Sequence, residues 1–147
     1  MLFGLLSAWP ALAGDWQEIV TVDLPGGQFS LARESLLESI ENEGLVVGTE
    51  SHVAEMLART RPAGAVSPYR SAVSIQFCSS LVAWQLALED PAQASLCPLS
   101  VAVLETVADG RVAYVYRVPA PGSPGRQAAT ELLRRIVGRA SEWAGTR

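Results

Sequence analysis

Apolar and polar residues alternate along this chain with two different periods, which predict strands in some segments and helices in others. Three stretches that are rich in β-branched residues or alternate with period two predict strands at residues 16–22, 45–48 and 72–78. The alternation is clearest in the third stretch, where Val73, Ile75 and Phe77 fall on one face. Such a strand buries one face and leaves the other half-exposed.

Two helices are predicted in the first half of the chain. Apolar residues recur at helical spacing from Phe29 to Ile40, with Ser30 as a candidate N-cap and Gly44 just past the end. Ser51 is a candidate N-cap for a shorter helix, whose apolar stripe consists of Val53, Met56 and Leu57.

Two further helices are predicted in the second half. Ser79 or Ser80 can cap the first of them, which ends at Asp90-Pro91 and carries an apolar face of Leu81, Trp84 and Leu88. The other follows a Pro-Gly segment at residues 119–125, and the middle of its apolar face holds Leu133 and Ile136.

A β-hairpin is predicted around Asp109-Gly110, which lies between apolar runs at residues 100–107 and 111–118. Asp-Gly is a strong hairpin signal because a type I′ turn requires a positive φ at both central positions. A two-residue loop would pair Glu105 with Tyr114 and Val103 with Tyr116.

The predicted order of elements is β-α-β-α-β-α-β-β-α, which indicates an α+β fold. We expect a mostly antiparallel sheet of about five strands, with the long first and last helices packed on one face. The length of 147 residues fits one domain, which we place at residues 14–147.

The first thirteen residues are apolar throughout and end in Ala11-Leu12-Ala13. A small residue on either side of the last leucine is typical of a signal-peptide cleavage site. The segment is shorter than the roughly 20 residues of a membrane-spanning helix. We therefore interpret residues 1–13 as a signal peptide remnant, expect no membrane span in the mature chain, and expect a periplasmic or secreted protein.

The charged residues argue against nucleic acid as a partner. The eleven basic residues, all arginines, are outnumbered by fifteen acidic ones, which gives a net charge of −4. A surface that follows a phosphate backbone needs clustered positive charge.

Two cysteines, Cys78 and Cys97, are the candidates for a disulfide, because an exported chain meets an oxidising compartment. The alternatives are two thiols that never meet, or a pair of reactive thiols that carry out redox or sulfur chemistry.

A ligand-binding face is predicted on the sheet. Its candidate residues combine aromatic surface with a few polar groups, as small-molecule sites do, and they are Gln76, Cys78, Glu105, Tyr114 and Tyr116. The same face could instead be a dimer interface, where tyrosine is also enriched.

Signals for catalysis and for metal binding are weaker. Cys78, His52 and Glu105 are the one set that could supply a nucleophile, a base and an acid, but no nucleophile motif surrounds them, so no catalytic residue is assigned. His52 and Met56 lie one helical turn apart and could ligate a metal or haem together with the cysteines, but no ligand pair has the spacing of a known site. No metal site is assigned.

The segment FCSSLVAWQLALEDPAQASLCPLSVAVLE, residues 77–105, resembles the core of an uncharacterised bacterial family, domain-of-unknown-function family 302. The resembling features are a cysteine that ends a strand, the pair Trp84-Gln85, Asp90-Pro91, and the run from Cys97-Pro98 to Glu105. In many relatives the second cysteine follows that proline, whereas here it precedes it, as in a periplasmic branch of the family. The resemblance covers about residues 29–137 and implies a small dimeric α+β fold of helices on a curved sheet, with no settled activity.

Three functions are compatible with these features. The first is an exported, non-enzymatic domain that binds a small ligand or a partner protein, with a homodimer as the expected assembly. The second is a redox or sulfur-handling protein that works through Cys78 and Cys97. The third is a haem or metal carrier.

Overall fold

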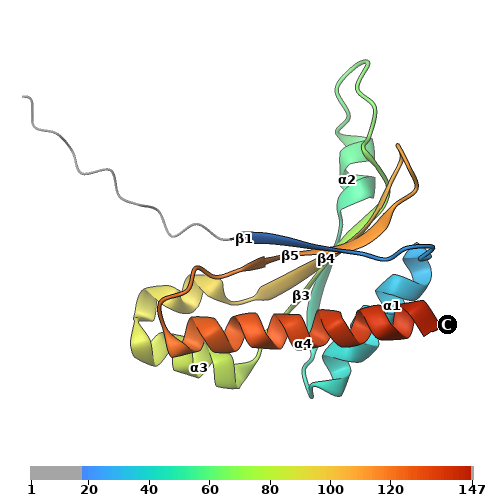
Figure 1. The fold of residues 1–147 in the computed structure, drawn as a ribbon. Coiled ribbons are helices and arrows are strands. Elements are labelled where there is room, and N and C mark those ends of the chain that lie inside the picture. The colour runs from blue at the N-terminus through green and yellow to red at the C-terminus, as the bar shows by residue number, and fades with distance from the viewer. Residues whose placement is uncertain (1–17, 147) are drawn as a thin grey trace, which may run out of the picture.

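A five-stranded antiparallel sheet with two long helices across one of its faces forms the core of the protein (Figure 1). The computed structural model describes residues 18–146. The elements are β1 (Glu18–Asp23), α1 (Phe29–Asn42), β2 (Val47–His52), α2 (Val53–Arg59), β3 (Tyr69–Phe77), α3 (Ser80–Glu89), the 3-10 helix η1 (Pro91–Leu96), β4 (Leu99–Thr106), β5 (Val112–Val118) and α4 (Pro124–Thr146). The strand order is β1-β5-β4-β3-β2. The expected α+β class and element order are confirmed, whereas the expected signal segment lies outside the described residues.

The core lies between the sheet and the long helices α1 and α4. Alternate residues of β3, β4 and β5 point into it, and the apolar stripes of the two helices cover them, among them Leu36 on α1 and Leu133 and Ile136 on α4. The Tyr114 hydroxyl donates a hydrogen bond to the carbonyl oxygen of Ala32 at 2.7 Å. This bond joins β5 to α1 through the interior, so the predicted packing of both long helices on one face is correct.

The register of the β4–β5 hairpin differs by two residues from the predicted one. Val103 pairs with Tyr114, and Glu105 pairs with Val112. The loop is longer than the predicted two residues. The Asp109 carboxylate stabilises it by accepting hydrogen bonds from the Thr106 hydroxyl and the Arg111 backbone N–H. Since side chains alternate with period two, a shift of two residues leaves each of them on its predicted face.

Two predicted N-caps are wrong. Helix α1 begins at Phe29 with Gln28 as its N-cap, so Ser30 lies inside the helix. Strand β2 runs from Val47 to His52 and therefore includes Ser51, which pairs with Ser74 of β3. The sequence of β2 is mostly polar, and its pairing with β3 extends the strand beyond the predicted residues 45–48.

Helix α3 packs with a different side from the predicted one. Its predicted inner stripe is exposed, with Leu81 at 82%, Trp84 at 68% and Leu88 at 78% accessible, while Leu86 is buried. The helix lies beside the first turns of α4 (Figure 1), where a Cβ at Gly125 would come within 3.0 Å of the Leu86 side chain. Apolar residues occur on nearly every side of α3, so periodicity alone does not identify the side that packs.

Helix α2 covers its predicted stripe only in part, since Val53 and Leu57 are half-buried. None of its residues is fully buried, and Met56 is 47% accessible. Among the described residues, no helix combines the length and the apolar character that a membrane crossing requires.

Candidate functional site

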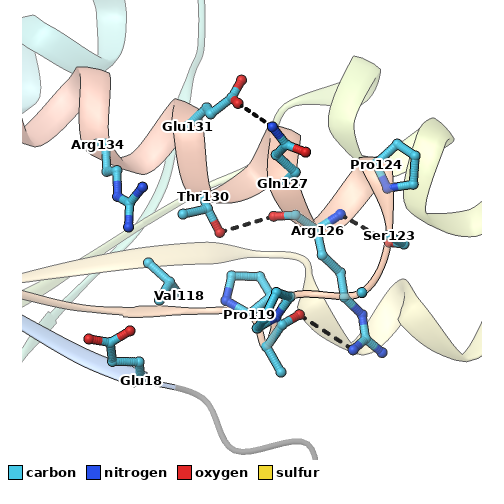
Figure 2. A pocket seen from close by; sticks show the side chains of 13 residues that line it. Glu18, Val118, Pro119, Ser123, Pro124, Arg126, Gln127, Thr130, Glu131 and Arg134 are labelled. Carbon is cyan, nitrogen blue, oxygen red and sulfur yellow. Dashed lines mark hydrogen bonds between the residues drawn. The ribbon is translucent and has the colours of Figure 1, made fainter.

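A cleft with a volume of about 700 Å³ borders the first turns of α4. Its opposite wall is formed by the end of β5, the start of β1 and the proline-rich connection from β5 to α4 (Figure 2). Binding sites for small molecules are clefts of about 300–1,000 Å³. The cleft is therefore large enough for a small ligand.

The connection between β5 and α4 has a shape that follows from its sequence. Two of its residues are prolines, Pro119 and Pro121, which fix φ and cannot donate a backbone hydrogen bond. Gly122 has a φ of 144°, which side chains rarely tolerate. Pro124 is the first residue of α4, a position where its missing N–H is not needed.

The N-terminus of α4 is already capped from two sides. The Ser123 hydroxyl oxygen accepts a hydrogen bond from the Arg126 N–H at 3.2 Å. The Glu89 carboxylate, at the end of α3, accepts from the Gly125 N–H at 2.6 Å and from the Ser123 hydroxyl at 2.5 Å. The hydrogen bond from Ser123 is the main cause that lowers the pKa of Glu89, and the bond from Gly125 adds to it. The N-terminus of α4 therefore already binds a carboxylate of the protein itself, that of Glu89.

Arg126, Thr130 and Arg134 follow each other at four-residue intervals on the cleft side of α4 (Figure 2). The Arg126 guanidinium donates to the Gln93 amide oxygen at 2.6 Å, and Gln93 is buried. Arg134 is exposed, and it forms no ion pair or hydrogen bond with any of residues 18–146. Its guanidinium is thus free to interact with a bound molecule.

Two charged residues of the cleft affect the pKa of Tyr116. Burial raises the pKa of Tyr116, the positive charge of Arg134 opposes that shift, and the negative charge of Glu18 adds to it. Glu18 and Arg134 both line the cleft. The cleft therefore carries a cation on α4 and a carboxylate at the start of β1 (Figure 2).

The family model "Domain of unknown function DUF302" matches residues 20–140. The chain belongs to the DUF302 family. No curated protein matches it.

The DUF302 domain also has a relative among the solved structures. An uncharacterised conserved DUF302 protein from Bacillus stearothermophilus is 19% identical, with a TM-score of 0.66. The match covers 86% of this chain and 97% of that one. At this identity the likeness shows the shared fold.

In this DUF302 domain, the five residues of the predicted ligand face do not form one surface. Tyr114 and Tyr116 point into the core under the helices, and burial raises the pKa of Tyr114. Gln76 lies on the opposite face of the sheet, because it alternates with the buried residues Ile75 and Phe77. Of the five residues, Tyr116 is the one whose pKa is affected by the charged residues of the cleft.

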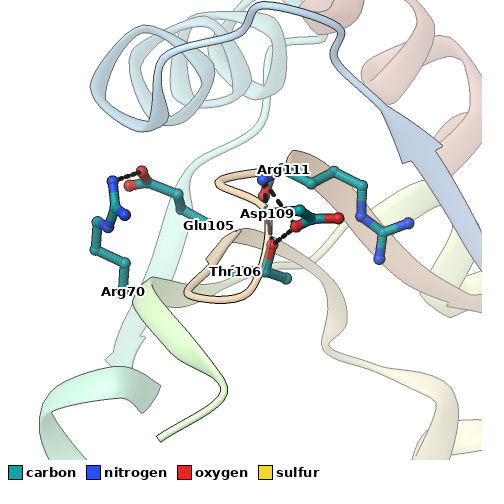
Figure 3. Close-up of polar contacts among 5 residues, drawn as sticks. All are labelled: Arg70, Glu105, Thr106, Asp109 and Arg111. Atoms are coloured by element: carbon teal, nitrogen blue, oxygen red, sulfur yellow. Dashed lines mark hydrogen bonds and ion pairs between the residues drawn. The ribbon is translucent and has the colours of Figure 1, made fainter.

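Glu105 is engaged at the other end of β4. Its carboxylate accepts a hydrogen bond from the Arg70 guanidinium at 3.0 Å, near the turn formed by Thr106, Asp109 and Arg111 (Figure 3). The hydrogen bond from Thr106 is the main cause that lowers the pKa of Asp109. The Arg70–Glu105 contact joins β3 to β4, and the contacts of Asp109 close the turn between β4 and β5.

The predicted disulfide between Cys78 and Cys97 is confirmed. Their Cα atoms are 6.1 Å apart, and the bond links the end of β3 to the start of β4 across α3 and η1. Cys78 is exposed and Cys97 is half-buried. Both cysteines of the chain are used, so neither is a free thiol in this structure.

The residues considered for catalysis and for metal binding are not gathered at one place. His52 pairs with Val73, about 16 Å along β3 from Cys78. The His52 ring nitrogen Nδ1 lies 3.7 Å from the Glu55 carboxylate. Within residues 18–146, no group of three or more His, Cys, Asp or Glu side chains could hold a metal ion.

The cleft residues were not identified from the sequence. The sequence marks residues 119–125 only as a Pro-Gly segment, and the prediction for the helix that follows concerns its apolar face. The available signal was the spacing of Arg126, Thr130 and Arg134 directly after a rigid Pro-Gly segment. That spacing places two cations on one side of the helix.

Proposed function

We propose that this DUF302 domain is exported and binds a small molecule carrying one carboxylate in the cleft beside α4, without catalysing a reaction. The observation that supports this is the exposed guanidinium of Arg134, which lines a cleft of about 700 Å³ and has no partner within the described part of the chain. A guanidinium binds a carboxylate with two parallel hydrogen bonds.

The charges and the apolar surface of the cleft restrict the class of ligand. Glu18, across from Arg134, would repel a second negative charge, so a ligand with a single carboxylate fits better than a phosphate or a dicarboxylate. Pro121 and Pro124, both exposed, offer apolar contact area to the remainder of the ligand.

Export is supported by two features. The chain begins with an apolar segment that ends in a small-residue cleavage pattern. The Cys78–Cys97 disulfide is typical of proteins in oxidising compartments.

The binding proposal is tested with benzoate and acetate as probes and benzyl alcohol as a neutral control, by following backbone amide shifts in NMR titrations. We expect benzoate to shift the amides around residues 118–134, acetate to bind more weakly, and benzyl alcohol not to bind. Arg134→Ala should weaken benzoate binding about tenfold, which corresponds to about 1.4 kcal/mol.

Arg59→Ala is the matched control for this experiment, because Arg59 is exposed at the end of α2, on an element that does not line the cleft. It should leave the affinity unchanged. Equal binding of benzoate by the Arg134→Ala variant and the unmodified protein would contradict the proposal.

Thiol–disulfide exchange is a second candidate function, and the exposure of Cys78 favours it. Cys78 directly precedes Ser79, the N-cap of α3, and lies at the surface. An exposed disulfide sulfur can be attacked by another thiol. Thiol labelling, described in the Discussion, distinguishes this function from a purely structural bridge.

A further inference from the structure

Helix α3 presents an apolar stripe to the outside. Leu81, Trp84 and Leu88 are 82%, 68% and 78% accessible, and their spacing of three and four residues places them on one side of the helix. Contiguous exposed apolar patches on a soluble domain mark interaction sites. Tryptophan is, in addition, among the residues most often found at the energetic centre of protein interfaces.

The stripe has no charge of its own. Residues 71–88 include no Asp, Glu, Lys or Arg, and neither do residues 91–104. The carboxylate of Glu89, directly after Leu88, is turned towards α4, where Ser123 and Gly125 donate to it. A strongly charged partner would therefore find no complementary charge on α3, whereas two copies of this surface would not repel each other.

Helix α3 is held firmly at both ends. Ser79 caps its N-terminus and the Cys78–Cys97 disulfide lies immediately before it. At its C-terminus, the buried Gln93 amide donates to the carbonyl oxygen of Leu86 at 3.0 Å. A surface that is already ordered loses little conformational entropy when it binds.

We propose that α3 is an interface at which two copies of this chain pack, with the two α3 helices antiparallel across a two-fold axis. Trp84 lies near the middle of the stripe, with Leu81 about 4.5 Å before it and Leu88 about 6 Å after it along the helix. Antiparallel packing brings Leu81 of each copy opposite Leu88 of the other, and Trp84 meets Trp84 at the axis. The stripe is thus complementary to itself, as a two-fold interface requires.

The stripe supplies the apolar centre of a dimer interface and part of its area. A specific interface buries about 800 Å² per partner, and the exposed parts of the three side chains supply roughly half of that area. Polar neighbours such as Gln85 and Ser95, both exposed, provide the rim that surrounds an apolar centre.

Sedimentation velocity over a concentration series tests the interface. The purified protein should be in a monomer–dimer equilibrium, and Trp84→Glu should weaken the dimer at least about a hundredfold, because two like charges would meet at the axis. Val66→Glu is the matched control, since Val66 is an equally exposed apolar residue, in the loop before β3. Val66→Glu should leave the equilibrium unchanged.

A charge pair tests the antiparallel arrangement. Leu81→Lys combined with Leu88→Glu places opposite charges against each other between the copies, whereas Leu81→Lys combined with Leu88→Lys places like charges there. The first double variant should associate at least about tenfold more tightly than the second. All four positions substituted in these two experiments are exposed, so circular dichroism should show an unchanged fold for each variant.

A protein that stays monomeric at every concentration overturns the proposal. A dimer that Trp84→Glu leaves intact places the interface on another surface and overturns it as well. Equal association of the two double variants excludes the antiparallel arrangement.

Discussion

Glu89 links α3 to α4 through a small network of hydrogen bonds. Its carboxylate accepts from Ser123, from the backbone of Gly125 and from Gln93, while Gln93 in turn accepts from Arg126. These bonds favour the charged form of the carboxyl group, so the pKa of Glu89 is lowered in the folded protein. The N-terminus of α4 is thereby fixed relative to α3, which also shapes one end of the cleft.

The lowered pKa of Glu89 predicts a change of stability with pH. A carboxyl group with a lower pKa in the folded state stabilises the fold above its ordinary pKa, and this contribution disappears as the pH falls through the folded pKa. We expect Glu89→Gln to melt a few degrees lower at neutral pH and to lose less stability than the unmodified protein below about pH 4. Thermal melts from pH 3 to pH 7 measure both effects.

Glu142→Gln is the control for this prediction, because Glu142 is exposed near the C-terminal end of α4, whereas α3 lies beside the first turns of that helix (Figure 1). It should reproduce the pH profile of the unmodified protein. If Glu89→Gln also reproduces that profile, the network does not contribute to stability.

At the scale of elements, α4 covers one face of the sheet together with α1 (Figure 1). Its inner side buries a continuous apolar stripe, with Leu133 and Ile136 fully inaccessible. The side chain of Ser39 on α1 donates to the carbonyl oxygen of Ile136 at 2.8 Å, which fixes the two helices against each other. The middle of α4 therefore contacts both the sheet and α1.

Ile136→Ala should lower the free energy of unfolding by about 2–5 kcal/mol, since it removes buried methyl groups and leaves a cavity. Arg134→Ala, two residues away and exposed, should change it by no more than about 0.5 kcal/mol. Urea denaturation of the three proteins measures these differences. Equal decreases in the free energy of unfolding for the two variants would contradict the assignment of this side of α4 to the core.

At the scale of the whole molecule, the disulfide closes the part of the chain that contains α3 and η1. Cys78 and Cys97 are 19 residues apart in sequence, and a cross-link over such a loop stabilises a fold by about 3 kcal/mol in the chain-entropy model. Reduction should therefore lower the melting temperature. A measurable decrease is expected with a reductant in calorimetry, and none in a variant in which both cysteines are replaced by serine.

Thiol labelling distinguishes a structural bridge from a reactive one. The native oxidised protein should show no free cysteine by mass spectrometry after alkylation, and a small dithiol such as dithiothreitol at low concentration should reduce the bridge only slowly. Rapid reduction followed by alkylation of Cys78 alone would favour thiol–disulfide exchange as the function.

The proposed export makes a prediction about the mature N-terminus. Expressed in a bacterium with its native upstream sequence, the protein should accumulate in the periplasm and begin near Gly14, because cleavage is expected after Ala13. Cell fractionation and intact-mass measurement check both points. A cytoplasmic protein that retains Met1 would contradict the proposed export.

The sequence by itself determined the fold class, the order of the elements and the inner faces of the strongly patterned segments. Val73, Ile75 and Phe77 on β3, and Leu133 and Ile136 on α4, are buried as predicted, because a clear period of two or 3.6 leaves one side able to face a core. The Ser79 N-cap follows from local chemistry and is confirmed. Such features depend on neighbours in the chain, which the sequence displays directly.

Only the tertiary structure decided which side of α3 packs, how long the β4–β5 turn is and where a cleft forms. The apolar residues of α3 surround the helix, so contact with Gly125 of α4 selected the buried side, and Leu81, Trp84 and Leu88 were left outside. The cleft joins residues of β1 and α4 that are more than a hundred positions apart, such as Glu18 and Arg134. Proximity of that kind arises from the packing of the layers, and no local pattern records it.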